Sequence, residues 1–151
     1  MKAEFKNVKT MDGMEGVAFS ASLYFDGKKV GSVVDDGNGG MPFVHFDYRV
    51  TSEQRAEWEA YCAACAAKHD SNGLNAEEYG VDALFDIWEE RKQIRSWMRT
   101  KVAMRISGRT YDEGAWDCIV GHRDTPERRE EIAKHYADKG TPIVEFAADR
   151  I

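Results

Sequence analysis

The stretch VAFSASLYFDGKKVGSVVDDGNGG, residues 17–40, predicts two strands, a tight turn between them and a glycine-rich loop after them. Apolar side chains occupy every second position over residues 19–25, which is typical of a strand with one buried face. Asp26 and Gly27 supply the positive φ angles that a two-residue hairpin turn requires. The return strand covers residues 30–34. The chain therefore begins its fold with an antiparallel hairpin.

The rest of the chain divides into blocks of short strands and blocks of amphipathic helices. Thr51 and Gln54 match a capping box, and Thr125-Pro126 is a typical helix start. Further strands are expected at residues 4–10, 43–50, 102–107, 115–120 and 142–147. Helices are expected from residues 51 to 69, 75 to 100 and 125 to 140. Because strands and helices come in blocks, we expect an α+β fold with a mainly antiparallel sheet and about three helices, in a single domain over residues 1–151.

Composition points to an ordinary globular protein of the cytoplasm. Of the 151 residues, 42% are hydrophobic and 32% are charged. The sequence has no apolar run long enough to cross a membrane, and no apolar stretch near its start that would direct secretion. Its three cysteines, an odd number, favour a reducing compartment. We therefore expect a cytoplasmic protein without membrane contact.

Charge is distributed unevenly along the chain. The net charge is −6 at pH 7, yet residues 91–109 carry basic side chains and no acidic ones. The basic residues complement the dipole at the end of a helix, which gives the run a purely structural role. Trp97 is expected to point away from the apolar arc of that helix, and a tryptophan among arginines is typical of binding hot spots. The predicted partner-binding residues are Arg91, Lys92, Arg95, Trp97 and Arg99.

The same basic run suggests a second kind of partner. Cations neutralise phosphates and an indole ring stacks on a base, so residues 91–109 form an alternative nucleic-acid or nucleotide-binding module. The sequence isoelectric point of about 5.3 is far below the basic value that is usual for such domains. Direct nucleic-acid binding is therefore the less favoured interpretation.

Two short pairs have metal-like spacing. Cys62 and Cys65, with His69 one turn further on, form the first pair, and Cys118 and His122 form the second. Together they offer the thiolate and imidazole ligands that zinc prefers. However, Cys62 and Cys65 fall on the core face of an alanine-rich helix, where cysteine commonly serves as a small apolar residue. They are weak metal candidates, and we expect no cofactor.

The loop after the hairpin offers carboxylates and free backbone amides. Asp35, Asp36 and Asn38 lie among the glycines of residues 35–40 and suggest a calcium or anion site. The loop lacks the final bidentate glutamate of a calcium-binding loop and the lysine of a phosphate loop. A tight connection between strands is the favoured interpretation.

No catalytic motif is present in the sequence. It contains no Gly-x-Ser-x-Gly elbow, no His-Glu-x-x-His and no dinucleotide-binding fingerprint. The segment from His122 to Asp124 has the letters of a kinase catalytic loop, but the glycine-rich and Asp-Phe-Gly elements are missing. We therefore expect a protein that is not an enzyme. The second alternative is a zinc-containing protein or small enzyme that uses Cys62, Cys65, Cys118 and His122.

The segment LYFDGKKVGSVVDDGNGG, residues 23–40, resembles the N-terminal hairpin of small uncharacterised proteins encoded by phages and prophages. The resemblance implies an accessory protein that is made during infection and acts in the host cytoplasm. It carries no catalytic residues to transfer. The expected function is to bind and block a host protein, such as a nucleic-acid-handling or defence factor, in the manner of anti-CRISPR or anti-restriction proteins.

Overall fold

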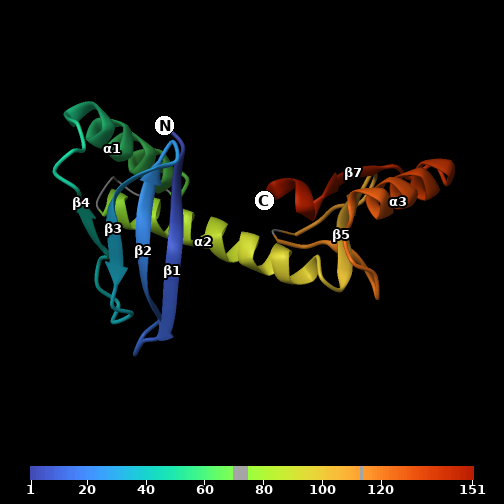
Figure 1. The fold of residues 1–151 in the computed structure, drawn as a ribbon, viewed down its shortest axis with the longest axis horizontal. Coiled ribbons are helices and arrows are strands. Elements are labelled where there is room, and N and C mark those ends of the chain that lie inside the picture. Colours follow the sequence, from blue (N-terminus) through green and yellow to red (C-terminus); the bar gives the residue numbers. More distant parts are fainter. Residues whose placement is uncertain (70–74, 113) are drawn as a thin grey trace. The chain divides into compact units, whose positions relative to one another are not determined.

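The computed structural model describes residues 1–69, 75–112 and 114–151, which form an α+β fold (Figure 1). The described helices are α1 (Ser52–Ala67), α2 (Ala76–Trp97), α3 (Pro126–Asp138) and the short 3₁₀ helix η1 (Ala147–Arg150). The described strands are β1 (Ala3–Asp12), β2 (Val17–Phe25), β3 (Lys28–Asp35), β4 (Phe43–Phe46), β5 (Lys101–Ile106), β6 (Asp117–Val120) and β7 (Ile143–Phe146). The predicted fold class is confirmed.

The chain divides into two compact units, Met1–Trp88 and Glu89–Ile151, with the boundary inside α2. Each unit has its own antiparallel sheet, in the order β1-β2-β3-β4 in the first and β6-β5-β7 in the second. Two sheets thus replace the single sheet that the sequence suggested. The expectation of a single domain stays a prediction.

The predicted hairpin is the centre of the first unit. β2 and β3 pair antiparallel, and Asp26 and Gly27 between them have φ angles of 49° and 80°, as a tight turn of this kind requires. β1 and β4 add to its two sides in antiparallel register. The fourth strand is shorter than expected because the chain turns after Asp47. The Asp47 amide still donates to the Val30 carbonyl of β3 at 2.8 Å, and the Val50 amide then donates to the Asp47 carbonyl at 3.1 Å.

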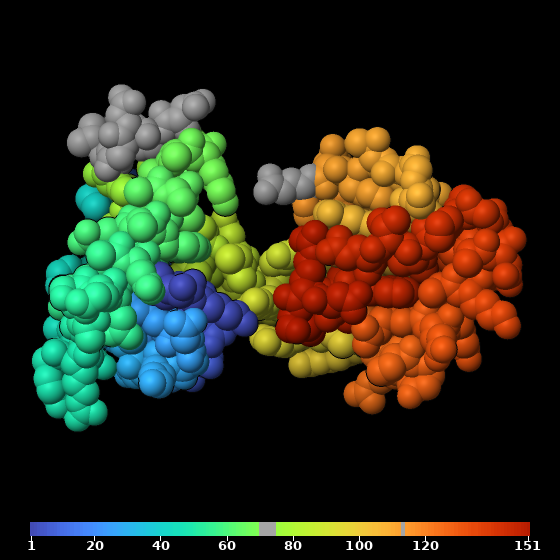
Figure 2. Space-filling model, turned by 90° about the horizontal axis from the view of Figure 1, so that it is seen from above, coloured from blue at the N-terminus to red at the C-terminus, as the bar shows by residue number. Residues whose placement is uncertain are grey.

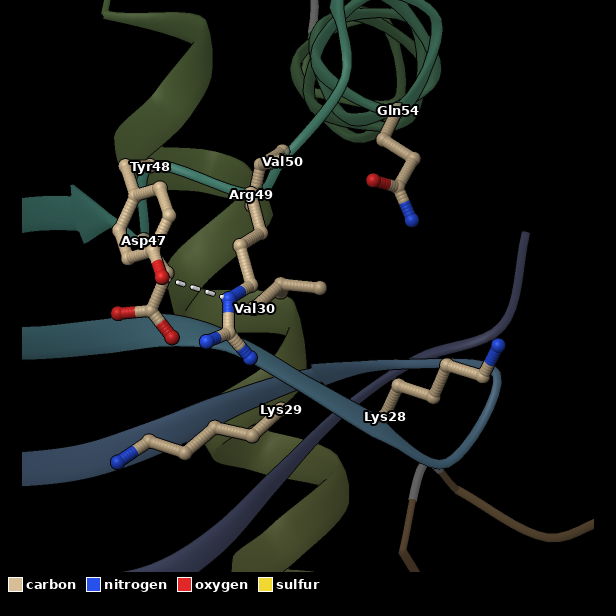
Figure 3. Close-up of a pocket in the computed structure, with 8 residues that line it drawn as sticks. All are labelled: Lys28, Lys29, Val30, Asp47, Tyr48, Arg49, Val50 and Gln54. Atoms are coloured by element: carbon tan, nitrogen blue, oxygen red, sulfur yellow. Dashed lines mark hydrogen bonds between the residues drawn. The ribbon is translucent and has the colours of Figure 1, made fainter.

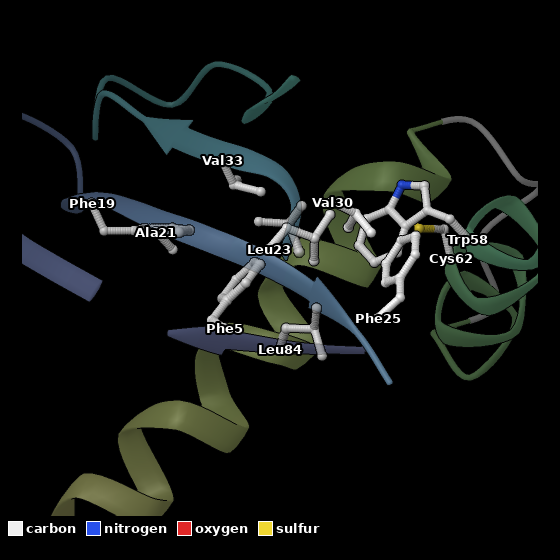
Figure 4. Close-up of a cluster of buried hydrophobic side chains, with 11 residues drawn as sticks. Phe5, Phe19, Ala21, Leu23, Phe25, Val30, Val33, Trp58, Cys62 and Leu84 are labelled. Carbon is white, nitrogen blue, oxygen red and sulfur yellow. The ribbon is translucent and has the colours of Figure 1, made fainter. Parts of the chain in front are cut away.

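One face of the first sheet packs against α1 and the first half of α2. Leu23, Phe25 and Val33 on the sheet are at most 2% exposed and contact Trp58 of α1 and Leu84 of α2 (Figure 4). The alternation of β2 places Leu23 and Phe25 on this face and Ser20, Ser22 and Tyr24 on the other. The first unit is therefore a two-layer structure in which the described helices cover only one face of the sheet.

Helix α1 begins where the sequence predicted. The Thr51 hydroxyl accepts a hydrogen bond from the Gln54 amide at 3.2 Å, and the Gln54 side chain accepts one from the Thr51 amide at 3.1 Å. This is the predicted capping box, which satisfies two of the helix's unpaired N–H groups. Trp58, Cys62 and Cys65 lie on the buried face, as expected, whereas His69 is exposed beyond the helix end.

In the second unit, a small cluster of apolar side chains packs against each face of the central strand β5. Val102 and Met104 pack with Ile132 of α3 on one face of the strand. Ala103, on the other face, packs with Ile94 near the end of α2 and with Ala147 of η1. Thr125 caps α3 by accepting a hydrogen bond from the Arg128 amide at 3.2 Å, as the Thr-Pro pair predicted.

Candidate partner-binding surface

The last turns of α2 place a row of cations at the surface of the second unit. Ile94 is 1% exposed and anchors the inner side of the helix. Arg95 is exposed and Arg91, one turn before it, is half-buried, so their spacing puts the two side chains on neighbouring positions of the outer side. Arg99 follows, exposed, just after the helix end. The second half of α2 is yellow in Figure 2. Most of the predicted basic residues thus lie on one short segment of the second unit.

Arg123 extends this row from a distant part of the sequence. It lies in the loop between β6 and α3 and is exposed. The Gly121 amide donates to the Thr100 carbonyl at 2.9 Å, and the Asp124 amide donates to the Met98 carbonyl at 2.8 Å. These two hydrogen bonds hold the backbone of Arg123 beside that of Arg99. The surface formed by Arg91, Lys92, Arg95, Arg99 and Arg123 is called the cationic face below.

Ion pairing separates the four arginines of the cationic face from the other arginines of the second unit. Arg105, Arg109, Arg128, Arg129 and Arg150 each lie within 4.0 Å of a carboxylate. Within residues 1–69, 75–112 and 114–151, no carboxylate lies within that distance of Arg91, Arg95, Arg99 or Arg123. Their charge is therefore available to an outside partner.

The paired arginines connect elements of the second unit to one another. Arg150 donates from Nε to Glu145 at 2.7 Å and from Nη1 to Glu90 at 2.8 Å. The hydrogen bond from Arg150 is the main reason why the pKa of Glu145 lies below its usual value. The guanidinium carbons of Arg105 and Arg150 lie 4.6 and 4.8 Å from the centroid of the Trp116 ring, within cation–π distance. This network joins α2, β7 and η1.

Trp97 does not lie where the sequence predicted. Its ring is half-buried and packs against the cluster of Ile94, Ala103 and Ala147 instead of facing away from the apolar arc. The Lys101 ammonium lies 4.2 Å from the ring centroid and covers it further. The prediction failed because η1 and β5 supply a second apolar surface, which a helical projection of α2 alone does not show. Trp97 is therefore part of the apolar cluster of the second unit.

The weak metal candidates are divided between the two units. Cys62 and Cys65 are buried in the first unit, and Cys62 belongs to its core cluster. Cys118 is exposed on β6 and His122 contacts Arg128, both in the second unit. Among the described residues, no group of three or more histidine, cysteine or acidic side chains is arranged to hold a metal ion.

The three thiols are expected to differ in reactivity. Burial, followed by the charge of Glu77, raises the pKa of Cys62 to about 12, so its thiol stays protonated near neutral pH. Under native conditions iodoacetamide should label Cys118 first and leave Cys62 and Cys65 unlabelled until the protein unfolds. Intact-mass spectrometry with and without urea checks this order. Equal labelling of all three thiols in the native protein would contradict the structure of the first unit.

The glycine-rich loop uses its polar side chains internally. Asp35 accepts a hydrogen bond from the Gly37 amide at 2.8 Å, and Asp36 accepts one from the Asn38 amide at 3.0 Å. The Gly37 carbonyl accepts from the Glu15 amide at 2.9 Å, which fixes the loop against the β1–β2 turn. These contacts support the favoured interpretation of a tight connection between strands.

A cluster of carboxylates lies beside this loop. Asp82 of α2 has a pKa above its ordinary value of 3.8, first because of burial and then because Glu78, Asp86 and Asp35 are close; His69 acts in the opposite direction. Asp35, Glu78 and Asp82 line an open cavity of about 270 Å³ together with Phe19 and Phe85. The ionised form of Asp82 therefore costs stability.

Replacing Asp82 with asparagine is expected to stabilise the protein slightly near neutral pH. A carboxyl group whose pKa is raised by folding opposes folding once the pH exceeds its unfolded pKa, and has no such effect below it. The melting temperature of Asp82→Asn should therefore exceed that of the wild type near pH 7, and the difference should vanish below about pH 3.5. Thermal melts at both pH values test this, with the exposed Asp12→Asn as control. A difference that does not change with pH would contradict the assignment.

Comparison with known proteins adds no family to these observations. No protein-family model, curated protein or solved structure matches this chain. In the described part of the chain, no helix is both long and apolar enough to span a membrane.

Proposed function

We propose that this protein is a binding protein without catalytic activity, and that its cationic face docks onto an acidic surface of a partner protein. The observation that supports the proposal is the set of arginines without carboxylate partners among the described residues, in a unit whose other arginines are paired. Arginine is enriched at the centres of protein interfaces, where its planar group binds carboxylates in a bidentate manner. The resemblance to phage accessory proteins makes a host nucleic-acid-handling or defence factor the proposed partner.

Two features favour a protein over a nucleic acid as the ligand of this face. The Trp97 ring packs inside the unit under Lys101, so it does not offer a free surface for a base. Exposed Asp86 and Glu89 lie on α2 just before the cationic residues. A phosphate strand would meet repulsion there, whereas a protein surface of mixed charge can complement both signs.

The upward pKa shifts of Cys62 and Tyr61 follow from packing and give these two residues no catalytic role. Cys62 has its pKa raised to about 12, mainly by burial, and the neighbouring Tyr61 has its pKa raised as well, again mainly by burial. Both pack in the core of the first unit. Groups tuned for acid–base or nucleophilic chemistry have instead pKa values moved toward the working pH and lie at a substrate-accessible surface.

Charge reversal of Arg95 and Arg99 tests the proposed function. The double variant Arg95→Glu/Arg99→Glu should bind a partner protein, first isolated by affinity pull-down with the wild type, at least roughly tenfold more weakly. Each arginine would be replaced by a charge that repels the partner's carboxylates. Biolayer interferometry with the immobilised full chain gives the affinity. The matched control is Lys134→Glu/Lys139→Glu, which reverses two exposed cations of the same unit on α3 and its end. Equal affinities of wild type and Arg95→Glu/Arg99→Glu would refute the cationic face as the docking surface.

A further inference from the structure

The uncovered face of the first sheet carries a regular array of side chains. In the register of the four strands, one row contains Lys6, Ser22, Ser32 and His45. The next row toward the glycine-rich loop contains Lys9, Ser20, Val34 and Phe43, and the row on the other side contains Glu4, Tyr24 and Lys29. Because paired residues of neighbouring strands point to the same side of a sheet, these side chains share one surface. This surface is called the open face below.

Charge is segregated between the two sides of the first unit. The unit as a whole is acidic, with 15 Asp and Glu against 8 Lys and Arg. The helical side carries seven of the carboxylates: Glu53, Glu57, Glu59, Glu77, Glu78, Asp82 and Asp86. The open face and the cavity at its edge carry five of the eight cations, beside the carboxylates of Glu4 and Asp47: Lys6, Lys9, Lys28, Lys29 and Arg49. A positive surface on an acidic unit is suited to an anionic ligand.

Most of these cations lack a carboxylate partner in the described part of the unit. Lys6 pairs with Glu4 at 2.9 Å. Over the described ranges, with residues 70–74 and 113 set aside, no carboxylate lies within 4.0 Å of Lys9, Lys28, Lys29 or Arg49. The charge of these four side chains can thus neutralise an outside anion.

Aromatic rings accompany the cations. Phe43 on β4 is 68% exposed and Tyr48, just beyond the same strand, is 87% exposed. Arg49 donates from Nε to the Tyr48 hydroxyl at 2.9 Å, and both side chains line an open cavity of about 440 Å³ (Figure 3). Lys29 of the open face lines this cavity too, so the open face and the cavity are continuous. Exposing rings of this size is unfavourable for an isolated protein and is typical of a contact surface.

We propose that the open face, together with the cavity at the end of β4, binds single-stranded nucleic acid. Lys9, Lys29 and Arg49 would neutralise phosphates, and Phe43 and Tyr48 would stack on bases. The serine hydroxyls between them can donate to phosphates and sugars without selecting a sequence. A four-stranded sheet with exposed aromatic side chains on its free face is a known way to hold unpaired bases. This inference concerns the first unit and does not depend on the proposed function of the second.

Fluorescence anisotropy with defined oligonucleotides tests the proposal on the full chain. The probes are fluorescein-labelled dodecamers of thymidine and of uridine, and the thymidine dodecamer annealed to its complement. The single strands should bind at low salt, more tightly than the duplex, with an affinity that falls as salt rises. Phe43→Ala should weaken binding about tenfold, since a stacking ring is lost. Lys9→Glu/Lys29→Glu should weaken it further and reduce the salt dependence.

Matched variants distinguish the open face from the remaining surface of the chain. Met14→Ala removes a side chain that is 91% exposed, and Lys68→Glu reverses an exposed cation at the end of α1; both should bind as the wild type does. No binding of either single strand would overturn the proposal. Equal or tighter binding of the duplex would do so as well. Binding that is lost in Arg95→Glu/Arg99→Glu but kept in Lys9→Glu/Lys29→Glu would assign the nucleic acid to the cationic face instead.

Discussion

Replacing Gly80 with alanine is expected to lower the free energy of unfolding by about 2 kcal/mol or more. Gly80 lies in the second turn of α2, and a Cβ at this position would fall on the Sγ atom of Cys62 in α1. Ordinarily the same change in a helix interior stabilises a protein by roughly 0.5–1 kcal/mol. The sign of the effect therefore reports directly on the close approach of the two helices.

A second substitution separates this clash from a general defect of the helix. Removing the sulfur with Cys62→Ala should restore much of the stability that Gly80→Ala loses, because the nearest remaining atom, the Cys62 Cβ, is 3.1 Å away. Urea unfolding of the wild type, both single variants and the double variant gives the coupling energy. Additive effects, or a Gly80→Ala protein as stable as the wild type, would show that α1 and α2 do not meet at these residues.

Replacing Trp58 with alanine is expected to cost about 3–5 kcal/mol, enough to unfold a marginally stable unit. Its side chain is 2% exposed and is among the largest that are fully buried. The ring stacks with Phe25 and Tyr61 at centroid distances of 6.0 and 5.7 Å, and Nε1 donates to Glu77 at 2.9 Å. One residue thus connects the sheet to both helices of the first unit.

The variant Trp58→Phe serves as the comparison. It retains an aromatic ring but loses the hydrogen bond to Glu77 and part of the buried surface, so its cost should be clearly smaller, on the order of 1–2 kcal/mol. Urea unfolding, monitored by far-ultraviolet circular dichroism, measures the free energy of unfolding of both variants. Equal stability of the alanine and phenylalanine variants would indicate that the ring is not packed as described.

Local sequence rules predicted the elements well. The Asp26-Gly27 turn, the capping box of α1 and the Thr125 cap of α3 each depend on residues within a few positions of one another. Alternation over residues 19–25 also gave the buried face of β2 correctly. Such features could be predicted because hydrogen bonds and steric limits within one turn decide them.

Features that depend on distant contacts were missed. The division of the strands into two sheets, the early end of β4 and the half-buried position of Trp97 are all set by packing between segments far apart in the sequence. For the same reason no pattern places Arg123 beside Arg99, since two backbone hydrogen bonds between loops do so. The basic run of α2 was predictable from composition, whereas the absence of a carboxylate near Arg91, Arg95 and Arg99 among the described residues required the structure.

The open face, too, could be predicted only in part from the sequence. Alternation predicts that Ser20, Ser22 and Tyr24 share a side of β2, but not whether a helix covers that side. The aligned rows appear only once the register of four strands is known. Sequence patterns therefore gave the candidate side chains of one strand, and the pairing of strands gave the surface.

An affinity pull-down from nuclease-treated bacterial lysate, with wild type and Arg95→Glu/Arg99→Glu compared by quantitative mass spectrometry, tests the central claim most directly. The nuclease removes any partner that is held only through nucleic acid on either surface. If the cationic face binds a protein, that protein should be enriched by the wild type and by Lys134→Glu/Lys139→Glu, and lost with Arg95→Glu/Arg99→Glu. A protein captured equally by all three, or no enrichment once nucleic acid is digested, would contradict the cationic face as a protein-binding surface.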